Sequence, residues 1–308
     1  MRDAFLISLM TLAETDNRVA LLTGDLGFGV VEKFGTKFPD RFWNCGVAEQ
    51  SMIGIAAGLA KSGMRPFVYS IANFPTFRCL EQIRNDICYH NLPVTIVSVG
   101  AGLGYGTLGY THHGIEDIAA MRSLPNISIY SPSDPIEVTN VLTRISQNPA
   151  PTYLRLGKNG EPEIQAGTSN AIPGSARELT SGSHLTILAT GAVTENCLRV
   201  AEQLRIQGFE IQVISVTQLE PLDIKFLLAN ITSTKILVVE EHVKRGGFTA
   251  ALLESFNENG SSPQLHRLYV NESNISEIGT QEYLRGLSGL DKDGIAKKCL
   301  EILQSKSV

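Results

Sequence analysis

The sequence has no excess of positive charge and no long apolar run. Its 308 residues include 26 Lys and Arg against 31 Asp and Glu, which gives a formal net charge of −5 and a pI of about 5.7. Such a chain lacks the basic surface expected of proteins that bind nucleic acid or membranes. No stretch of 18 apolar residues occurs, and Met1-Arg2-Asp3 leads into helix-like sequence rather than a signal peptide. We therefore expect no nucleic-acid partner, no membrane association and a cytoplasmic location.

Cysteine is scarce and irregularly spaced. A disulfide framework or a cysteine metal site would show paired residues at short, regular spacing. The five cysteines are odd in number and include no Cys-x-x-Cys pair; they are Cys45, Cys79, Cys88, Cys197 and Cys299. We expect reduced thiols and no metal site in this chain.

The pattern that is present is that of α/β domains. Apolar runs of strand length, such as 19–23 and 94–99, alternate with helical segments, which is typical of buried parallel strands. The length predicts two domains. We predict two doubly wound α/β domains with mainly parallel sheets, over 1–160 and 184–308. A Gly-, Pro- and Ser-rich segment without periodicity, 161–183, is predicted to be the linker.

Glu49 stands at the start of a helix of small and apolar residues. The helix is apolar nearly all round, so we expect it to be buried on every side. No basic residue lies within one turn of Glu49. A carboxylate in this position can lie at the surface, cap the helix or serve as a buried acid. The small-residue helix favours the buried, working acid.

Other candidate residues follow predicted strands. Asp25 follows strand 19–23, at the end where open α/β sheets place their ligands. Asp25 is either a turn residue or a helix cap, or it contacts a ligand there. Phe74 and Phe77 follow strand 65–70 at helical spacing, and core packing is the alternative to a role in binding.

A glycine-rich loop follows strand 94–99. Gly104 to Gly109 match Gly-x-Gly-x-x-Gly, but a dinucleotide site needs the glycines to turn directly into a helix after the first strand of a βαβ unit. Here Tyr110-Thr111-His112-His113 intervenes. We expect either a flexible loop or an active-site lid. His112 and His113, at a helix entrance beyond the loop, are candidate functional residues.

These motifs carry a family resemblance. Gly46-Val47-Ala48-Glu49-Gln50 before a small-residue helix resembles the pyrimidine-binding domain of thiamine diphosphate enzymes, in the transketolase branch. Thr111-His112-His113-Gly114 resembles a further family segment, and Glu240-Glu241-His242 with Gly246-Gly247 matches the family's C-terminal domain. The resemblance covers the whole chain.

The resemblance implies roles for the candidate residues. Glu49 would hydrogen-bond and protonate the aminopyrimidine ring of the cofactor. The opposite amino group, as an imine, then removes the proton from the thiazolium carbon. Phe74 would stack on that ring with Phe77 beside it, and His112 would contact the donor substrate. We expect Asp25 to contact the cofactor as well.

Departures from the family pattern concern the substrate. Leu108 stands near the position of an acidic residue that binds substrate hydroxyls. Gly100 and Gly29 replace a histidine and a serine that help to hold a sugar phosphate. Arg2 and Arg155 match the phosphate-binding arginines and can pair with phosphate, sulfonate or carboxylate. With His112 and His113 they complete the predicted substrate site, and we expect a substrate other than the ordinary pentose phosphates.

The chain lacks the Gly-Asp-Gly motif with a spaced Asn that holds diphosphate and Mg²⁺ in the family. We therefore predict an N-terminal partner subunit that holds them, with two copies of each chain. The predicted function is that of the C-terminal subunit of a two-chain transketolase-like enzyme, transferring a two-carbon ketol unit between sugar-like molecules. The alternatives are a decarboxylating relative that joins a 2-oxo acid to an aldehyde, and a non-catalytic assembly subunit.

Overall fold

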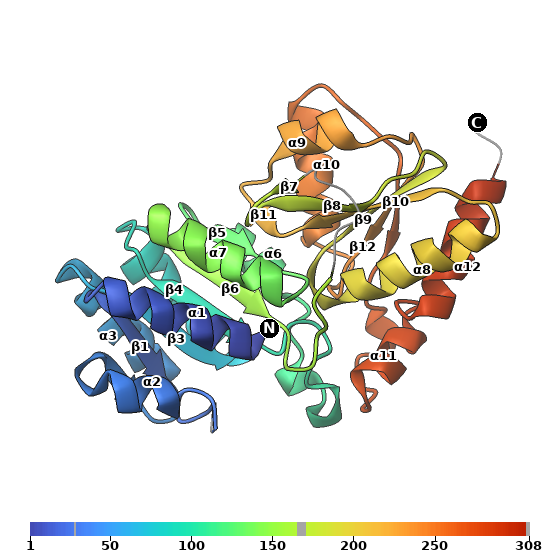
Figure 1. Cartoon of the computed structure of the whole chain (residues 1–308). Helices are drawn as coiled ribbons and strands as arrows, with labels where there is room; N and C mark the ends of the chain where they lie inside the picture. The colour runs from blue at the N-terminus through green and yellow to red at the C-terminus, as the bar shows by residue number, and fades with distance from the viewer. Residues whose placement is uncertain (28, 165–170, 306–308) are drawn as a thin grey trace.

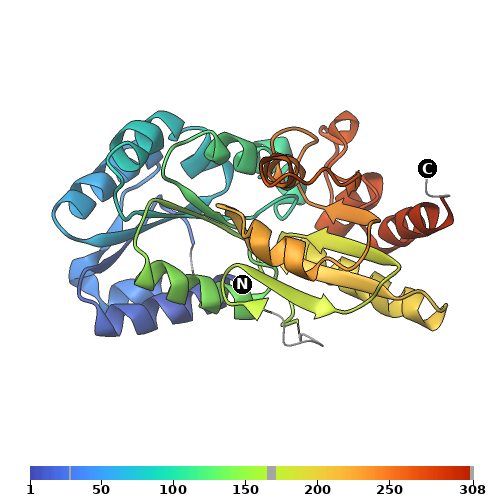
Figure 2. The ribbon, with the colours of Figure 1, turned by 90° about the horizontal axis from the view of Figure 1, so that it is seen from above.

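The computed structural model describes residues 1–27, 29–164 and 171–305. They form two α/β domains that lie side by side (Figure 1). Seen from above, each domain has its own sheet with helices on both faces (Figure 2). The predicted class, two doubly wound domains with mainly parallel sheets, is confirmed. Within the described residues, no helix combines the length and apolar character needed to cross a lipid bilayer.

The first sheet has seven strands in the order β11-β5-β6-β4-β3-β1-β2. All neighbours are parallel except β11, which runs antiparallel to β5. Every residue of β1, β4 and β6 is buried, as expected for strands covered on both faces. The strands are β1 (Val19–Thr23), β2 (Phe42–Asn44), β3 (Arg65–Ile71), β4 (Thr95–Val99), β5 (Ser128–Tyr130), β6 (Thr152–Leu156) and β11 (Gln218–Glu220).

Helices cover both faces of this sheet. α1 and α7 pack together over one face, and α3 with α6 covers the other. The helices are α1 (Arg2–Thr15), α2 (Glu32–Lys37), α3 (Glu49–Lys61), α4 (Asn73–Thr76), α5 (Leu80–Gln82), α6 (Asp117–Arg122) and α7 (Pro135–Gln147). Short 3₁₀ segments are η1 (Pro39–Arg41), η3 (Gly106–Leu108) and η4 (Tyr110–His112), and η2 (Ile83–Cys88) is a π-helical segment.

The second sheet has six strands in the order β13-β12-β9-β10-β8-β7. Its strands are β7 (Ala171–Ile172), β8 (Ala176–Thr180), β9 (Leu185–Ala189), β10 (Ile211–Val216), β12 (Ile236–Val239) and β13 (Leu265–Leu268). Its helical elements are η5 (Gly191–Val193), α8 (Thr194–Ile206), α9 (Ile224–Asn230), α10 (Phe248–Glu258), η6 (Glu272–Asn274), α11 (Gln281–Leu287) and α12 (Lys292–Gln304).

The predicted linker 161–183 is wrong for residues 171–180. These residues form β7 and β8 at the edge of the second sheet; β7 pairs antiparallel to β8, and β8 pairs antiparallel to β10. β8 has no apolar pattern in the sequence because it carries polar side chains with partners in the fold. Arg177 pairs with Asp134 at 3.0 Å, and Glu178 accepts a hydrogen bond from Gln212. Residues 165–170 of the predicted linker lie outside the described residues.

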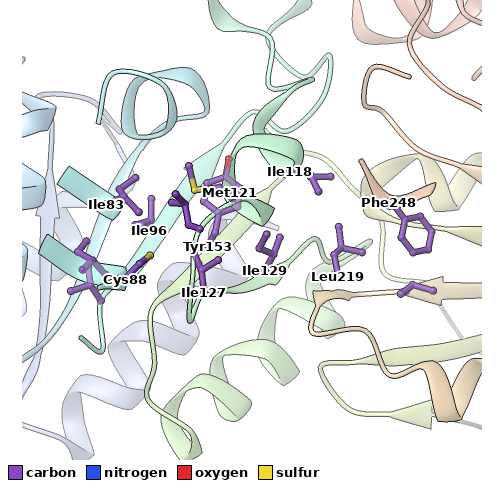
Figure 3. Packing of buried hydrophobic residues seen from close by; sticks show 14 of the residues in the cluster. Ile83, Cys88, Ile96, Ile118, Met121, Ile127, Ile129, Tyr153, Leu219 and Phe248 are labelled. Carbon is purple, nitrogen blue, oxygen red and sulfur yellow. The ribbon is translucent and has the colours of Figure 1, made fainter. Parts of the chain in front are cut away.

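One hydrophobic cluster spans both domains. One cluster of buried side chains runs from α3 and the first sheet into the second domain (Figure 3). Ile129 of the first domain, Leu219 of β11 and Phe248 of α10 belong to it, and each is at most 2% exposed. Because β11 extends the first sheet from within the second domain, the domains are joined by backbone pairing as well as by packing.

Candidate active site

Glu49 is the first residue of α3 and lies at the carboxyl edge of the first sheet. Its side chain is 1% exposed, which confirms that it is buried. Its Oε2 accepts a hydrogen bond from Arg78 Nη1 at 2.5 Å. Gly24, at the end of β1, has no side chain there, and a Cβ would lie 3.3 Å from Glu49 Oε1. The carboxylate thus sits at a helix N-terminus, where the helix dipole favours negative charge.

The helix behind Glu49 is not buried on every side. Its inner face carries Met52 and Ile53, both 0% exposed. Its outer face carries Ile55, 46% exposed, and a Cβ on Gly54 would meet nothing within 4 Å. The prediction of an all-round buried helix is wrong for this chain, because the apolar outer face is not covered by any part of the chain that the structure describes.

Phe74 is linked to Glu49 through Arg78, and it also contacts His112. The Arg78 guanidinium lies over the Phe74 ring, 4.7 Å from its centroid, and the His112 ring meets Phe74 edge-on at 5.3 Å. Phe74 is half-buried, whereas Phe77 is 44% exposed. Neither ring belongs to the hydrophobic core, so the core-packing alternative fails for both.

The glycine-rich segment forms a loop over this edge that is hydrogen-bonded to α4. Asn73 donates to the Thr111 carbonyl at 3.1 Å, and the Thr111 hydroxyl lies 2.9 Å from His112 Nδ1. Leu108, on η3, is 51% exposed. His113 points away into the contact between the domains and is 1% exposed, and burial lowers its pKa. The structure therefore brings His112 to Phe74 but not His113.

Arg2 lines a cavity of about 220 Å³ at the carboxyl ends of β1, β3 and β4. Its Nε is buried without a hydrogen-bond partner among the described residues. Tyr105 forms another wall and lies 6.5 Å, ring to ring, from His112. Lys158 Nζ lies 5.0 Å from the Tyr105 ring centroid. The remaining lining residues are Leu26, Gly27, Tyr69, Ile71 and Val99.

Lys158 is a residue that the sequence analysis missed. It lies two residues beyond the end of β6, at the same sheet edge as the other candidates. The rule that placed Asp25 at a strand end would also have indicated Lys158. Arg155, which was predicted instead, lies inside β6.

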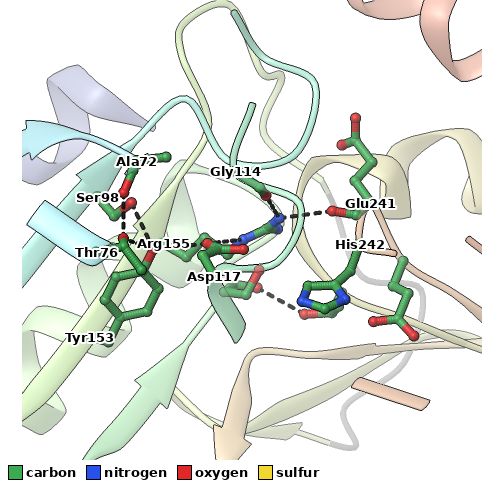
Figure 4. A network of polar contacts seen from close by, with 12 residues as sticks. Ala72, Thr76, Ser98, Gly114, Asp117, Tyr153, Arg155, Glu241 and His242 are labelled. Atoms are coloured by element: carbon green, nitrogen blue, oxygen red, sulfur yellow. Dashed lines mark hydrogen bonds and ion pairs between the residues drawn. The ribbon is translucent and has the colours of Figure 1, made fainter. Parts of the chain in front are cut away.

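Arg155 is 2% exposed and is bonded to protein atoms (Figure 4). Its Nε donates to Asp117 Oδ2 at 2.8 Å, and its Nη2 donates to the carbonyls of Gly114 and Glu241 at 2.6 and 2.8 Å. Burial alone would lower the pKa of Arg155, but Asp117 raises it on balance. The structure does not bring Arg155 to the surface beside Arg2.

Asp25 is exposed at the same edge, in a left-handed backbone conformation with φ of 57°. For a residue other than glycine this conformation is uncommon and is held by its surroundings. Asn44 holds it: Asp25 N donates to Asn44 Oδ1 at 3.1 Å, and Asn44 Nδ2 donates to Asp25 Oδ1 at 2.9 Å. Asn44 Oδ1 also accepts from Gly46 N, so the Asp25 turn is fixed relative to the start of α3.

The assembled site fits one half of thiamine diphosphate. A buried carboxylate and an aromatic face stand together, and the face already carries a planar cationic group, the Arg78 guanidinium. An aminopyrimidine ring is also planar and can stack on an aromatic face. Among the described residues, no group of three or more His, Cys, Asp or Glu side chains could hold a metal ion.

Comparison with known proteins agrees with this geometry. The models of the transketolase pyrimidine-binding domain and the transketolase C-terminal domain match residues 1–161 and 174–295. An apulose-4-phosphate transketolase subunit of Phocaeicola vulgatus is 32% identical over 306 residues, 98% of this chain and 97% of that protein.

Two further comparisons concern split enzymes. The 6-deoxy-6-sulfo-D-fructose transketolase subunit SqwH of Clostridium sp. (strain MSTE9) is 31% identical over 309 residues, 100% of this chain and 95% of that protein. A solved split gene transketolase, an inactive beta4 tetramer, is similar with a TM-score of 0.88 and 31% identity over 99% of both chains. The chain therefore belongs to the transketolase family, of which it carries the pyrimidine-binding and C-terminal domains.

Proposed function

We propose that this chain is the C-terminal subunit of a two-chain, thiamine-diphosphate-dependent transketolase-like enzyme, located in the cytoplasm. The enzyme moves a two-carbon ketol unit between sugar-like substrates. The observation that carries the proposal is the buried Glu49 carboxylate joined through Arg78 to the Phe74 ring, with His112 edge-on to the same ring.

Glu49, Phe74 and Asp25 are the proposed cofactor contacts, with Phe77 beside them. Thiamine diphosphate, when bound, supplies the carbon nucleophile that carries the two-carbon unit. Glu49 would move a proton between a carboxyl oxygen and a ring nitrogen of the aminopyrimidine. Phe74 offers the ring a flat apolar face and excludes water from it.

The substrate site extends from His112 to the Arg2 cavity. His112 contacts the donor, and Leu108 presents an apolar side chain beside it. Arg2 and Lys158 place two positive charges around Tyr105, which suits a substrate with an anionic end. The names of the relatives support such a substrate, since one is named for a sugar phosphate and one for a sulfo sugar.

A partner subunit is proposed to hold the diphosphate and Mg²⁺, in an assembly with two copies of each chain. Both curated relatives are named as subunits, which supports a second polypeptide. The apolar residues Val47, Ile55 and Phe77 are 76%, 46% and 44% exposed; the first two flank Glu49 in the sequence, and Phe77 precedes its ion-pair partner Arg78. Exposed apolar patches of this kind mark protein interfaces.

The test is to purify the chain alone and together with a partner encoded next to it. Titration calorimetry with thiamine diphosphate and Mg²⁺ should show tight binding for the mixture and weak or no binding for the chain alone. Transfer from a ketose donor to an aldehyde acceptor should then require both chains. Product formation from pyruvate instead of a ketose would indicate the 2-oxo acid reaction. Binding or turnover unaffected by omission of this chain would indicate an assembly role.

A further inference from the structure

The second domain contributes no side chain to the candidate site described above, yet it touches the loop that carries Leu108 and His112. This loop, residues 102–114, is closed at its base by Gly102 and Gly114, whose N–H groups each donate to the other's carbonyl at 2.9 Å. Beyond its base, the loop is held by contacts with the elements around it.

On one side those contacts come from α4, where Asn73 donates to the Thr111 carbonyl, and on the other side they come from the segment just before α11 and from α11 itself. Gly279 N donates to the Gly106 carbonyl at 3.3 Å. The contact is close enough to require glycine: a Cβ on Gly106 would lie 2.6 Å from the Gly279 carbonyl oxygen and 2.6 Å from Leu284 Cδ1. A Cβ on Gly109 would lie 3.4 Å from Ile278. The middle of the loop thus rests on backbone and apolar atoms of the second domain.

The ends of the loop are also built into the core of the second domain. Leu103 and Ile115 are 3% and 0% exposed and belong to the same hydrophobic cluster as Leu284. The Ile115 carbonyl accepts a hydrogen bond from Val243 N at 2.8 Å. A change in the position of α11 would therefore be transmitted to the loop through packed atoms.

A buried ion pair fixes α11. Arg285 donates from Nε and Nη2 to the two carboxylate oxygens of Glu241, at 3.1 and 2.8 Å, and Gln281 donates to Oε1 at 3.0 Å. The side chains of Arg285 and Glu241 are 10% and 3% exposed. Burial alone would raise the pKa of Glu241, but Arg285 lowers it on balance, so the carboxylate remains charged and paired. A fork of two donors sets both the distance and the angle of the helix.

Glu241 also faces the loop base. A Cβ on Gly102 would lie 2.6 Å from Glu241 Cβ, and the Glu241 carbonyl accepts from Arg155 (Figure 4). Glu241 therefore contacts α11, the base of the loop and the first domain.

We propose that Arg285, acting through Glu241 and the Gly279–Gly106 contact, is a positioning residue for His112 and Leu108. The second domain then takes part in substrate binding by fixing the substrate loop, whereas Glu49 lies on α3, outside that loop. The kinetic part of this proposal rests on the proposed function, but the structural part does not.

Hydrogen–deuterium exchange on the full chain tests the structural part. Gly106→Ala inserts one methyl group at the contact, where φ lies outside the left-handed region and the backbone tolerates alanine. We expect amide exchange in peptides covering 103–113 to rise about tenfold, while peptides covering 49–61 stay unchanged. The matched control is Gly286→Ala on α11 itself, where a Cβ would make an ordinary contact of 3.5 Å with Asp291. Unchanged exchange in the loop of Gly106→Ala would overturn the proposal.

Arg285→Met and Arg285→Lys test the ion pair. We expect Arg285→Met to raise loop exchange as Gly106→Ala does, and Arg285→Lys to restore part of the protection, since it keeps the charge but loses the fork. A soluble Arg285→Met chain with wild-type loop exchange would also overturn the proposal. If Arg285→Met does not fold, Gly106→Ala and Arg285→Lys decide the matter.

Kinetics on the chain assembled with its partner test the consequence for substrate. With D-fructose 6-phosphate as donor, KM should rise about tenfold in Gly106→Ala, with thiamine diphosphate affinity unchanged by calorimetry. A fall in cofactor affinity equal to the rise in KM would contradict a role limited to the loop. Failure of the wild-type assembly to bind thiamine diphosphate would refute the proposed function and leave the exchange result valid.

Discussion

The open edge of the first domain and the seam between the two domains are built from the same kind of pair, a buried carboxylate with an arginine. At the open edge, Glu49 is 1% exposed and the side chain of its partner Arg78 is 43% exposed. In the seam, Asp117 is 0% exposed and its partner Arg155 is 2% exposed. The carboxylates are equally buried, so the difference between the two regions lies in the arginines.

The exposure of the arginine decides what each carboxylate–arginine pair can do. An arginine that stands partly in water can leave its partner at a small cost, because water takes over its hydrogen bonds. An arginine enclosed on all sides cannot leave without an uncompensated charge being buried. The open edge is therefore suited to exchange partners with a ligand, and the seam is suited to hold elements in place.

The largest expected effect on activity comes from substitution of Glu49, the buried carboxylate at the open edge. Glu49→Gln keeps the shape and the burial of the side chain but cannot pass a proton to the aminopyrimidine. We expect turnover to fall by about a thousandfold or more, with the urea midpoint nearly unchanged. Hydrogen–deuterium exchange at the thiazolium carbon, measured on the assembled enzyme, is the direct readout. The matched control is Glu81→Gln, an exposed carboxylate on α5, and wild-type exchange in Glu49→Gln would remove Glu49 from the mechanism.

A substitution in the seam should instead lower the free energy of unfolding. Arg155→Met leaves Asp117 buried without its cation, and it removes donors to the Gly114 and Glu241 carbonyls. We expect a loss of about 3–5 kcal/mol in the free energy of unfolding, measured by urea denaturation. Arg199→Met is the control, because that side chain is 51% exposed and its pairs contribute little. A loss below about 1 kcal/mol would show that the seam is not held by this pair.

The sequence predicts the elements that form the two regions better than their contacts. Apolar runs and the small-residue helix locate the strands of the first sheet and the start of α3, because burial on both faces leaves a continuous apolar pattern. The same pattern is misleading on the outer face of α3, where apolar residues such as Ile55 are exposed. Hydrophobicity records that a face is apolar, and does not record what covers it.

The ion pairs could not be predicted from the sequence, because the two partners of each pair lie far apart along the chain. Arg78 reaches Glu49 from 29 residues away, and Glu241 reaches Arg285 from 44 residues away. Neither pair has a local signal such as helical spacing. Arg155 and Lys158 lie three residues apart, but the end of β6 falls between them, so Arg155 is enclosed and Lys158 lies over the Tyr105 ring. Motif similarity alone does not locate that strand end to within a residue.

At the open edge, a smaller effect is expected on substrate choice. Leu108 is 51% exposed on the loop and cannot hydrogen-bond a substrate hydroxyl. Leu108→Asp should raise kcat/KM for xylulose 5-phosphate relative to the best native donor by about tenfold, because an unpaired hydroxyl costs about 1–3 kcal/mol. Leu108→Ala is the control for lost bulk. An equal ratio of kcat/KM values in all three proteins would exclude Leu108 from donor selection.

The smallest effect should come from Arg78, and it completes the comparison of the two arginines. Arg78→Met removes the partner of a buried carboxylate, as Arg155→Met does, but Arg78 is 43% exposed, so we expect water to reach Glu49 through the space that the guanidinium leaves. We therefore expect a loss of only about 1 kcal/mol in the free energy of unfolding, measured by the same urea denaturation. The stacking of Arg78 on Phe74 is included in that figure, since an exposed cation–π contact contributes about 0.5–1 kcal/mol. A loss as large as that of Arg155→Met would show that the exposure of the arginine does not set the cost, and the distinction between the open edge and the seam would then have to rest on the carboxylates.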